Sequence, residues 1–302
     1  MIDSPLPAPP LGECPNAAAH QLEHSPKGGA GGGLYFIFCK GDILLTKEGT
    51  IPFGVSPPVE IQPWEEVTSW TPSSSPLQGE SIYSSPYKGE VGRGSGAIRV
   101  FSLSFPVTNN PDFQMVPLRK SFHILSAEDY QLAGKCAELV YFHQNTRFCG
   151  VCGGAMRWQT EISKKCCECG KELWPSLATA IIVRVTRDDK ILMVHAHSFR
   201  DRHYGLVAGF VETGETLEEC VQREVWEETH LRVTNIRYFA SQPWPYPSGL
   251  MVGFTADYLS GELQLQKAEL SDGGWFSRDN LPCLPDPSSI AYRLIMDWAK
   301  AT

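Results

Sequence analysis

The 302-residue sequence lacks any apolar run approaching the roughly 18 residues of a membrane-spanning helix. Its N-terminus lacks both the long apolar core of a signal peptide and the Arg-rich amphipathic pattern of a transit peptide. The chain ends in WAKAT and not in the Ser-Lys-Leu of peroxisomal proteins. These absences lead us to expect a soluble, cytoplasmic protein.

Positive charge is also scarce, because 26 Lys and Arg residues are outnumbered by 34 Asp and Glu residues. The resulting net charge of −8 provides no general attraction for nucleic acid, although a local basic patch is compatible with it. The length is sufficient for two domains and a substantial buried core.

Cysteine, by contrast, is abundant, with ten residues. Four of them form the pattern C-x2-C-x13-C-x2-C, with glycines 150, 153 and 170 in the two knuckles. This spacing predicts one structural Zn²⁺ held by four thiolates, Cys149, Cys152, Cys166 and Cys169, with a redox pair or disulfides as the alternative. Cys167 is interpreted as a non-ligand. A four-thiolate zinc has no open position for a catalytic water, and its thiols indicate a reducing, intracellular compartment.

The pattern along the chain predicts a tail followed by folded segments. The tail is rich in Pro, Ala and Gly and is expected to be disordered. The predicted segments are the tail at 1–33, a β-rich domain at 34–125 with a Ser-, Pro- and Gly-rich loop at 71–96, a linking helix at 126–148, a zinc ribbon at 149–176 and a C-terminal domain at 177–302. Local signals include a hairpin turn at 40–42, a Ser126 helix cap and a hairpin turn at 188–189.

Residues 209–231, GFVETGETLEECVQREVWEETHL, place seven carboxylates around a short turn and a helical pattern. Glycines 205, 209 and 214 permit positive φ in and before the turn. Helical spacing puts Glu224, Glu227 and Glu228 on one face, and the neighbouring Arg223 cannot neutralise three acids. A divalent cation such as Mg²⁺ or Mn²⁺ suits this face, and a solvated acidic helix is the alternative.

Downstream, SQPWPYPS at 241–248 alternates prolines with Gln242, Trp244 and Tyr246. The prolines stiffen an extended segment, so its aromatic faces are available to stack on a nucleobase or nicotinamide ring. A packed aromatic loop is the alternative. Three histidines, His195, His197 and His203, are interpreted mainly as surface or packing residues, with substrate contact as the less favoured alternative.

The pattern G-x5-E-x7-R-E-V-W-E-E-x-x-L, from Gly209 to Leu231, resembles the Nudix box. It departs at His230, where the family usually has glycine; at a helix end a non-glycine residue adopts αL at modest cost. SQPWPYPS is similar to the signature of the NADH pyrophosphatase (NudC-like) family within the Nudix superfamily. The preceding zinc ribbon agrees with that family, and the resemblance covers about residues 120–302 well.

The resemblance implies an α+β fold, with an N-terminal β-rich domain, a four-Cys zinc ribbon and a C-terminal Nudix α/β/α sandwich that contains a mixed sheet. It implies metal-dependent hydrolysis of the pyrophosphate bond of NADH or NAD⁺ to nicotinamide mononucleotide, reduced or oxidised, and AMP. It also implies removal of NAD caps from RNA 5′ ends. Family members are commonly homodimers.

The resemblance also implies site residues. Those expected to act in catalysis and to bind Mg²⁺ or Mn²⁺ are Glu224, Glu227, Glu228 and Glu269, with the main-chain carbonyl of Ala208 as a further metal ligand. Those expected to bind substrate are Glu161, Trp174, Gln242, Pro243, Trp244, Pro245, Tyr246, Pro247, Ser248, Gly249 and Ala291. The aromatic Trp174 replaces the tyrosine that the family usually carries.

Two alternative functions come from different classes. A Nudix hydrolase of another nucleoside diphosphate derivative, such as ADP-ribose, needs the box but not the 241–248 segment. An RNA-binding zinc-ribbon module, the less favoured alternative, predicts salt-dependent RNA binding that survives loss of the glutamates. Lys164, Lys165 and Lys171 form a small basic cluster that is most simply read as solvated surface.

Overall fold

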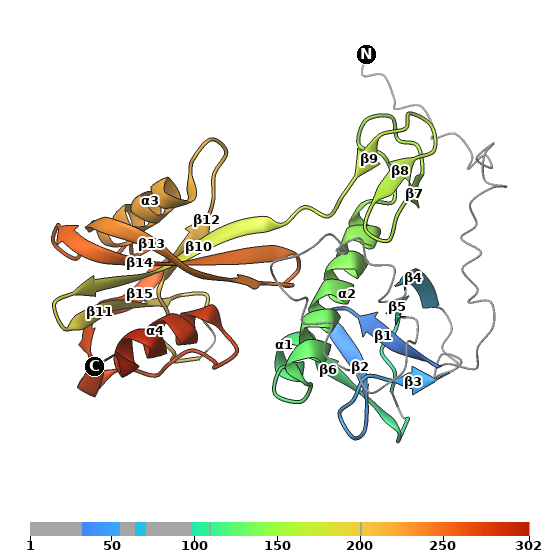
Figure 1. Ribbon diagram of the computed structural model, residues 1–302, viewed down its shortest axis with the longest axis horizontal. Helices are drawn as coiled ribbons and strands as arrows, with labels where there is room; N and C mark the ends of the chain where they lie inside the picture. The colour runs from blue at the N-terminus through green and yellow to red at the C-terminus, as the bar shows by residue number, and fades with distance from the viewer. Residues whose placement is uncertain (1–31, 55–63, 71–97, 109, 200, 302) are drawn as a thin grey trace, which may run out of the picture. The chain divides into compact units, whose positions relative to one another are not determined.

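The computed structural model describes residues 32–54, 64–70, 98–108, 110–199 and 201–301 (Figure 1). The predicted loop at 71–96 and nearly all of the predicted tail lie outside these residues. The chain divides into two compact units, Met1–Pro175 and Ser176–Thr302. The finer division predicted within the first unit stays a prediction. None of the helices in the described ranges is long and apolar enough to span a bilayer.

The first unit contains a six-stranded sheet in the order β4-β5-β1-β2-β6, with β3 paired to β1. Its strands are β1 Gly33–Cys39, β2 Asp42–Thr46, β3 Phe53–Gly54, β4 Trp64–Trp70, β5 Ile98–Leu103 and β6 Phe113–Pro117. As predicted, β1 and β2 form a hairpin, and Lys40 and Gly41 turn with φ of 50° and 92°. Tyr35, Leu44 and Phe101 are buried in its core.

Two helices follow this sheet in the chain, the short α1 (Leu118–Ser121) and the long α2 (Ala127–Asn145). The predicted cap is present, because the Ser126 side chain accepts a hydrogen bond from the Asp129 amide at 3.1 Å. Helix α2 packs against β1, β4 and β5 and buries Leu132, Cys136 and Leu139. It is therefore part of the first unit's core and more than a linker.

The three-stranded ribbon consists of β7 (Met156–Trp158), β8 (Lys164–Cys166) and β9 (Glu172–Leu173). The reading of Lys164 as solvated surface is wrong, because its side chain is only 1% exposed. Its ammonium donates to the carbonyls of His143 at 3.0 Å and Thr146 at 3.1 Å, at the C-terminal end of α2. These orphan carbonyls and the helix dipole stabilise the buried charge, so Lys164 ties the ribbon to the helix.

The second unit is a sandwich around a six-stranded sheet in the order β13-β14-β10-β11-β15, with β12 paired to β10. Its elements are β10 Ala178–Arg187, β11 Lys190–Ala196, β12 Val207–Phe210, α3 Leu217–Thr229, β13 Arg232–Pro243, β14 Gly249–Ser260, β15 Leu270–Ser277, the 3₁₀ helix Arg278–Asn280 and α4 Ile290–Lys300. Strands β10 and β14 are parallel and the other pairs are antiparallel, so the sheet is mixed. The hairpin predicted at 188–189 joins β10 and β11.

Helices α3 and α4 cover opposite faces of this sheet (Figure 1). Alternation along β10 explains why: Ile181 packs in the cluster that contains Val221 of α3, whereas Ile182 packs in the cluster that contains Leu294 of α4. The predicted α/β/α sandwich with a mixed sheet is confirmed. The sandwich fixes α3 against the end of β12, where the carboxylate-rich segment begins.

Candidate functional site

The turn from β12 into α3 is stabilised by a capping box. The Thr216 side chain accepts from the Glu219 amide at 3.2 Å, and the Glu219 carboxylate accepts from the Thr216 amide at 2.7 Å. Gly214 has a φ of 97°, as its place in the turn predicts. At the other end, His230 ends the helix with a φ of 57° and a ψ of 21°, the αL geometry expected from the sequence.

Gly209 does not have positive φ, so the predicted reason for this glycine is wrong. Its real role is a close approach, because a β-carbon added there would overlap the carboxyl group of Glu224. Glycine at this position therefore lets the Glu224 carboxylate lie directly against the β12 backbone. Gly205 likewise lacks positive φ.

Arg223 binds three carboxylates at once, more than its neighbourhood in the sequence led us to expect. Its guanidinium holds Glu215 through two hydrogen bonds of 2.7 and 3.0 Å, and contacts Glu224 at 2.8 Å and Glu227 at 3.0 Å. A further N–H donates to the Phe210 carbonyl at 2.9 Å. The bidentate contact lowers the pKa of Glu215 to about 2. Arg223 thus fastens the loop, the strand end and the helix together.

Glu228 is the most unusual carboxylate of the cluster, because its residue is only 6% exposed. Burial, followed by the charges of Glu224, Glu269 and Glu227, raises the pKa of Glu228 to about 8. Burial is also the main cause of the raised pKa of Glu224. Within the described ranges, no Lys or Arg side chain pairs with Glu228.

The other predicted metal-binding residues lie around this pair. Ala208 immediately precedes Gly209 in β12, and Glu269 immediately precedes β15. The charge of Glu269 contributes to the raised pKa of both Glu224 and Glu228, so it belongs to the same electrostatic cluster. Glu227, by contrast, has a half-exposed side chain turned toward Arg223. Carboxylates whose charges act on one another supply the oxygen ligands that a divalent cation prefers, and the binding of a cation here stays a prediction.

Sequence reasoning left Gly209, Glu215 and Arg223 out of the list of site residues. The structure shows that they hold Glu224 and Glu227 in place. All three residues occupy fixed positions in the box pattern, and that pattern could have identified them as site residues.

The predicted substrate-binding segment forms the connection between β13 and β14. Its ends are joined by a hydrogen bond from the Trp244 amide to the Gly249 carbonyl at 2.8 Å. The Trp244 and Tyr246 rings meet edge to face at 5.2 Å, and the Gln242 amide group donates to the Ser288 carbonyl at 2.8 Å. The segment is an ordered aromatic loop whose substrate contacts stay predictions.

The remaining predicted substrate residues lie in different environments. Ala291, in the first turn of α4, is 9% exposed and packs in the core cluster under that helix. Trp174 and Glu161 belong to the first unit, where the Trp174 side chain is largely exposed. Their roles in binding stay predictions.

Two of the three histidines, His195 and His203, are engaged in structural contacts. His195 lies between the Ser271 hydroxyl at 2.8 Å and the Asp201 carbonyl at 3.0 Å. His203 contacts the Asp201 carboxylate and stacks on Phe199 with ring centroids 4.2 Å apart. These contacts agree with the reading of the histidines as packing and surface residues.

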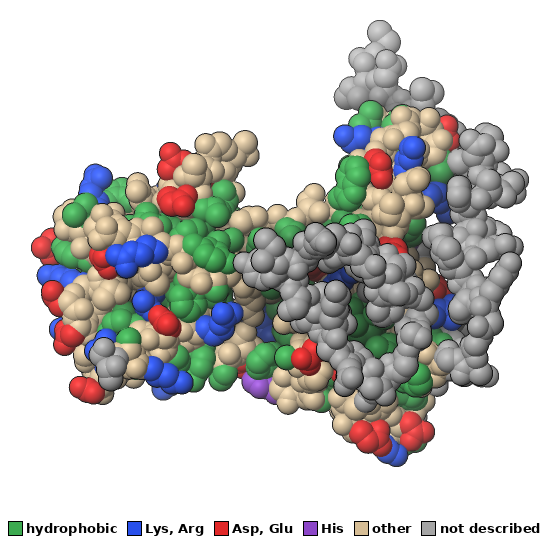
Figure 2. All heavy atoms as spheres, viewed as in Figure 1, with side chains coloured by type: hydrophobic (Ala, Val, Ile, Leu, Met, Phe, Trp, Pro, Cys, Tyr) green, Lys and Arg blue, Asp and Glu red, His purple; other side chains and the backbone are tan. Residues whose placement is uncertain are grey.

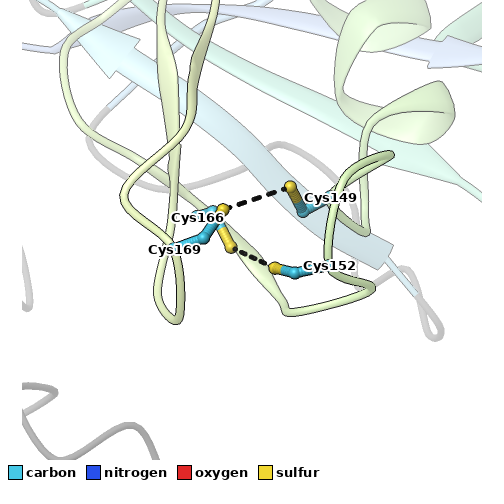
Figure 3. A group of neighbouring side chains, drawn as sticks. All are labelled: Cys149, Cys152, Cys166 and Cys169. Atoms are coloured by element: carbon cyan, nitrogen blue, oxygen red, sulfur yellow. Dashed lines mark hydrogen bonds between the residues drawn. The ribbon is translucent and has the colours of Figure 1, made fainter.

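The four cysteines of the ribbon converge on one point, and Figure 3 shows their side chains directed toward one another. All four sulfur atoms lie within 4.8 Å of one another, with 3.6 Å between Cys149 and Cys169 and 3.4 Å between Cys152 and Cys166. A tetrahedral Zn–S distance of about 2.3 Å requires sulfur atoms about 3.8 Å apart, whereas a disulfide requires about 2 Å. The cluster therefore has the dimensions of a zinc site.

Backbone amides support thiolates in this cluster. The Val151 amide donates to Cys149 Sγ, and the Glu168 amide donates to Cys166 Sγ, each at 3.4 Å. Amide donors lower the pKa of Cys149 to about 7 and lower the pKa of Cys166. Thiolates are the form that binds zinc.

We expect the full-length protein to contain one zinc ion per chain, measured by elemental analysis. Removing it with a chelator, or replacing Cys152 with serine, is expected to unfold the ribbon, because structural zinc supplies several kcal/mol of folding free energy. Hydrogen exchange at 149–173 would then rise strongly. Cys167→Ser is the matched control and should retain the zinc; loss of zinc in this variant would contradict the assignment of ligands.

Comparison with known proteins identifies the family. A family model of the NUDIX domain matches residues 175–299. The chain is 46% identical over 169 residues to the "NAD-capped RNA hydrolase NudC" of Pectobacterium atrosepticum, which covers 56% of this chain and 65% of that protein. It is 45% identical over 174 residues to the protein of the same description from Enterobacter sp. (strain 638), covering 57% and 67%.

A solved structure, a NUDIX hydrolase from Nitrosomonas europaea, is 25% identical with a TM-score of 0.41 and covers 51% of this chain and 88% of that one. The chain spans about two thirds of the length of the curated relatives that it matches. The box geometry, the four-cysteine ribbon and these relatives agree, so the chain belongs to the NudC-like family of the Nudix superfamily.

Proposed function

We propose that this protein hydrolyses the pyrophosphate bond of NADH or NAD⁺ to nicotinamide mononucleotide and AMP, and that it also removes NAD caps from RNA 5′ ends. The names of its relatives, NAD-capped RNA hydrolases, support the choice of substrate. We further propose Mg²⁺ or Mn²⁺ as the catalytic cation, a homodimer as the assembly and the cytoplasm as the compartment. The resemblance to the family supports these last points, and the free thiols of the ribbon are consistent with a reducing compartment.

The observation that carries the proposal is the buried carboxylate of Glu228, whose pKa is raised by burial and by the charges of Glu224 and Glu269. A carboxylate in this environment is unfavourable as an anion, as its raised pKa shows. A divalent cation would reverse the sign of the local field and hold the group ionised. The solvated acidic helix, the alternative reading from the sequence, does not account for a carboxylate at 6% exposure.

Within this proposal, the Glu224 and Glu228 carboxylates and the Ala208 carbonyl would hold divalent cations. When bound, the cations would supply neutralisation of the phosphate oxygens and a lower pKa for the attacking water. A glutamate accepts the proton of the water that attacks phosphorus, and the anhydride oxygen leaves with the second phosphate. Arg223 donates hydrogen bonds to Glu224 and Glu227 and so orients their carboxylates, and Glu224, Glu227 and Glu269 are the candidates for this proton acceptor.

Aromatic side chains of the 242–249 loop are proposed to bind the bases of the dinucleotide. Trp244 and Tyr246 lie edge to face with ring centroids 5.2 Å apart, and both side chains are half-buried. Stacking on an aromatic face contributes on the order of 1–3 kcal/mol per base. The hydrogen bond that closes the loop keeps both rings on a short, ordered connection.

The charge distribution does not favour the RNA-binding module as the main function. Lys164 is buried, which leaves Lys165 and Lys171 as the exposed members of the small basic cluster. On the face shown in Figure 2, Lys and Arg side chains of the described residues are interspersed with acidic ones. We therefore propose that the protein recognises mainly the NAD cap of a capped RNA, and that the RNA chain itself is not the principal ligand.

The test is release of AMP from NADH, NAD⁺, NAD-capped RNA and ADP-ribose by zinc-loaded, full-length protein with Mg²⁺ or Mn²⁺. We expect cleavage of the NAD-containing substrates that requires the added cation. Preference for ADP-ribose would replace the proposed substrate by the alternative. A folded protein that cleaves no NAD-containing substrate would refute the proposed activity.

A further inference from the structure

The connection from β14 to β15 docks on the C-terminal end of α3. We name residues 264–269 the metal-site loop, because Glu269 ends it. The Gln264 amide donates to the Thr229 carbonyl at 3.0 Å, and the Gln266 amide donates to the Glu228 carbonyl at 2.8 Å. The loop thus binds α3 at Glu228, the residue with the buried carboxylate. The acceptors, the main-chain carbonyls of Glu228 and Thr229, belong to the last turn of the helix, where carbonyls have no partner within the helix.

His230 adds a side-chain contact to this docking. Its Nδ1 lies 3.2 Å from the Gln264 carbonyl, and since a carbonyl can only accept, Nδ1 carries the proton. His230 makes this contact from αL backbone geometry, which glycine adopts without strain and histidine does not. The side-chain contact therefore distinguishes His230 from a residue that merely ends the helix.

A second histidine binds the other end of the same loop. Nε2 of His197, which follows β11, lies 3.1 Å from the Lys267 carbonyl, so Nε2 donates. The backbone amide of His197 also donates to the carbonyl of Glu269 at 2.8 Å. The two imidazoles thus hold main-chain carbonyls on either side of Gln266, and the backbone amide of His197 holds the main-chain carbonyl of Glu269.

We propose that His230 and His197 are positioning residues that hold Glu269 in the geometry in which it shares a divalent cation with Glu228. This inference rests on the proposed function for the identity of the site. Mg²⁺ and Mn²⁺ prefer a closely defined set of oxygen positions, and groups that orient metal ligands typically change metal affinity by 10–100-fold. Glu269 is exposed and stands at the start of a strand, so its position depends on the loop that precedes it.

The loop has an independent anchor, which makes the proposal testable in folded protein. Leu265 packs against the core cluster under α3, and its side chain occupies the space beside Gly273 of β15, where an added β-carbon would lie 3.1 Å from Leu265 Cδ2. The Glu269 and Leu270 amides also donate to the Gln266 carbonyl at 3.1 and 2.9 Å. Removing an imidazole should therefore loosen the position of Glu269 and leave the loop docked.

The experiment measures Mn²⁺ binding to zinc-loaded, full-length protein by electron paramagnetic resonance, without substrate. Glu228→Gln serves as the reference that lacks the site. His230→Gly is expected to bind Mn²⁺ about 10-fold more weakly than wild type, although it relieves backbone strain and unfolds no earlier. His197→Ala is expected to weaken binding similarly. His230→Asn, which tolerates αL and supplies a donor near Nδ1, and His197→Gln, which supplies one near Nε2, should restore part of the affinity.

Asp188→Gly is the matched control, because Asp188 also has αL geometry, with a φ of 54°, but lies in the β10–β11 turn. It should relieve the same kind of strain and leave Mn²⁺ affinity unchanged. Wild-type affinity in both His230→Gly and His197→Ala would overturn the proposal and reduce the histidines to structural residues. Mn²⁺ binding that depends on the histidines, in a protein that cleaves no dinucleotide, would refute the proposed activity and leave the positioning role standing. Equal Mn²⁺ binding by wild type and Glu228→Gln would overturn both.

Discussion

Replacing Glu228 with glutamine is expected to lower kcat for NADH hydrolysis by about 10³-fold. The amide keeps the size of the side chain but removes the charge that binds the cation, and metal assistance is worth several kcal/mol at the transition state. Glu218→Gln, an exposed change on the same helix, is the matched control and should retain activity within about twofold. Steady-state assays at saturating Mg²⁺ measure both, and a fully active Glu228→Gln would remove this residue from the site.

The same substitution is expected to change the pH dependence of stability. Without divalent cation, Glu228 has a pKa of about 8 in the folded protein and about 4.5 in the unfolded chain. Between these values the folded state keeps a proton that the unfolded state has released. The contribution of Glu228 to the free energy of unfolding should therefore be fully present below about pH 4.5. It should decrease as the pH rises from there and be lost once the pH has passed through about 8.

Urea unfolding between pH 5 and 8, with the zinc retained and no Mg²⁺ or Mn²⁺ added, measures this slope. Glutamine cannot ionise, so the Glu228→Gln protein should lose that part of the slope and be more stable than wild type at pH 8, by an amount on the order of a few kcal/mol. Saturating Mg²⁺ should flatten the slope of the wild type, because the cation stabilises the ionised form. An identical slope in wild type and variant would show that Glu228 titrates normally.

Replacing Gly209 with alanine is expected to lower kcat by about 10²-fold with little loss of folding stability. The added β-carbon overlaps the Glu224 carboxyl group, which must then move away from the β12 backbone. A displacement of about 1 Å at a catalytic constellation is enough for an effect of this size. The backbone itself tolerates alanine, because Gly209 lacks positive φ.

Gly274→Ala in β15 provides the control in the same unit, since its β-carbon would make only ordinary contacts, 3.8 Å or more from the Phe276 ring. It should retain both activity and cation affinity. The Mg²⁺ concentration required for half-maximal activity should rise in Gly209→Ala and stay unchanged in Gly274→Ala. Equal activity and equal Mg²⁺ requirement in the two variants would show that catalysis does not depend on the position of the Glu224 carboxylate against β12.

The features that the sequence by itself determined are those set by local spacing. Helix capping at Ser126, the hairpin turns at 40–42 and 188–189, and the αL geometry of His230 depend on residues a few positions apart. The knuckle cysteines and the box carboxylates repeat at intervals that metal binding and one helix face require. Such patterns are readable without knowing which segments meet in space.

Only the tertiary structure decided the features that depend on contacts between distant segments. Lys164 is buried because its strand meets the carbonyl end of α2. Gly209 must be glycine because the Glu224 carboxyl group occupies the space that a β-carbon at this position of β12 would need. The docking of residues 264–269 on α3 likewise brings the charge of Glu269 close enough to raise the pKa of Glu228, 41 positions earlier in the chain. Burial and close approach are properties of packed pairs of elements, and no periodicity along either segment encodes them.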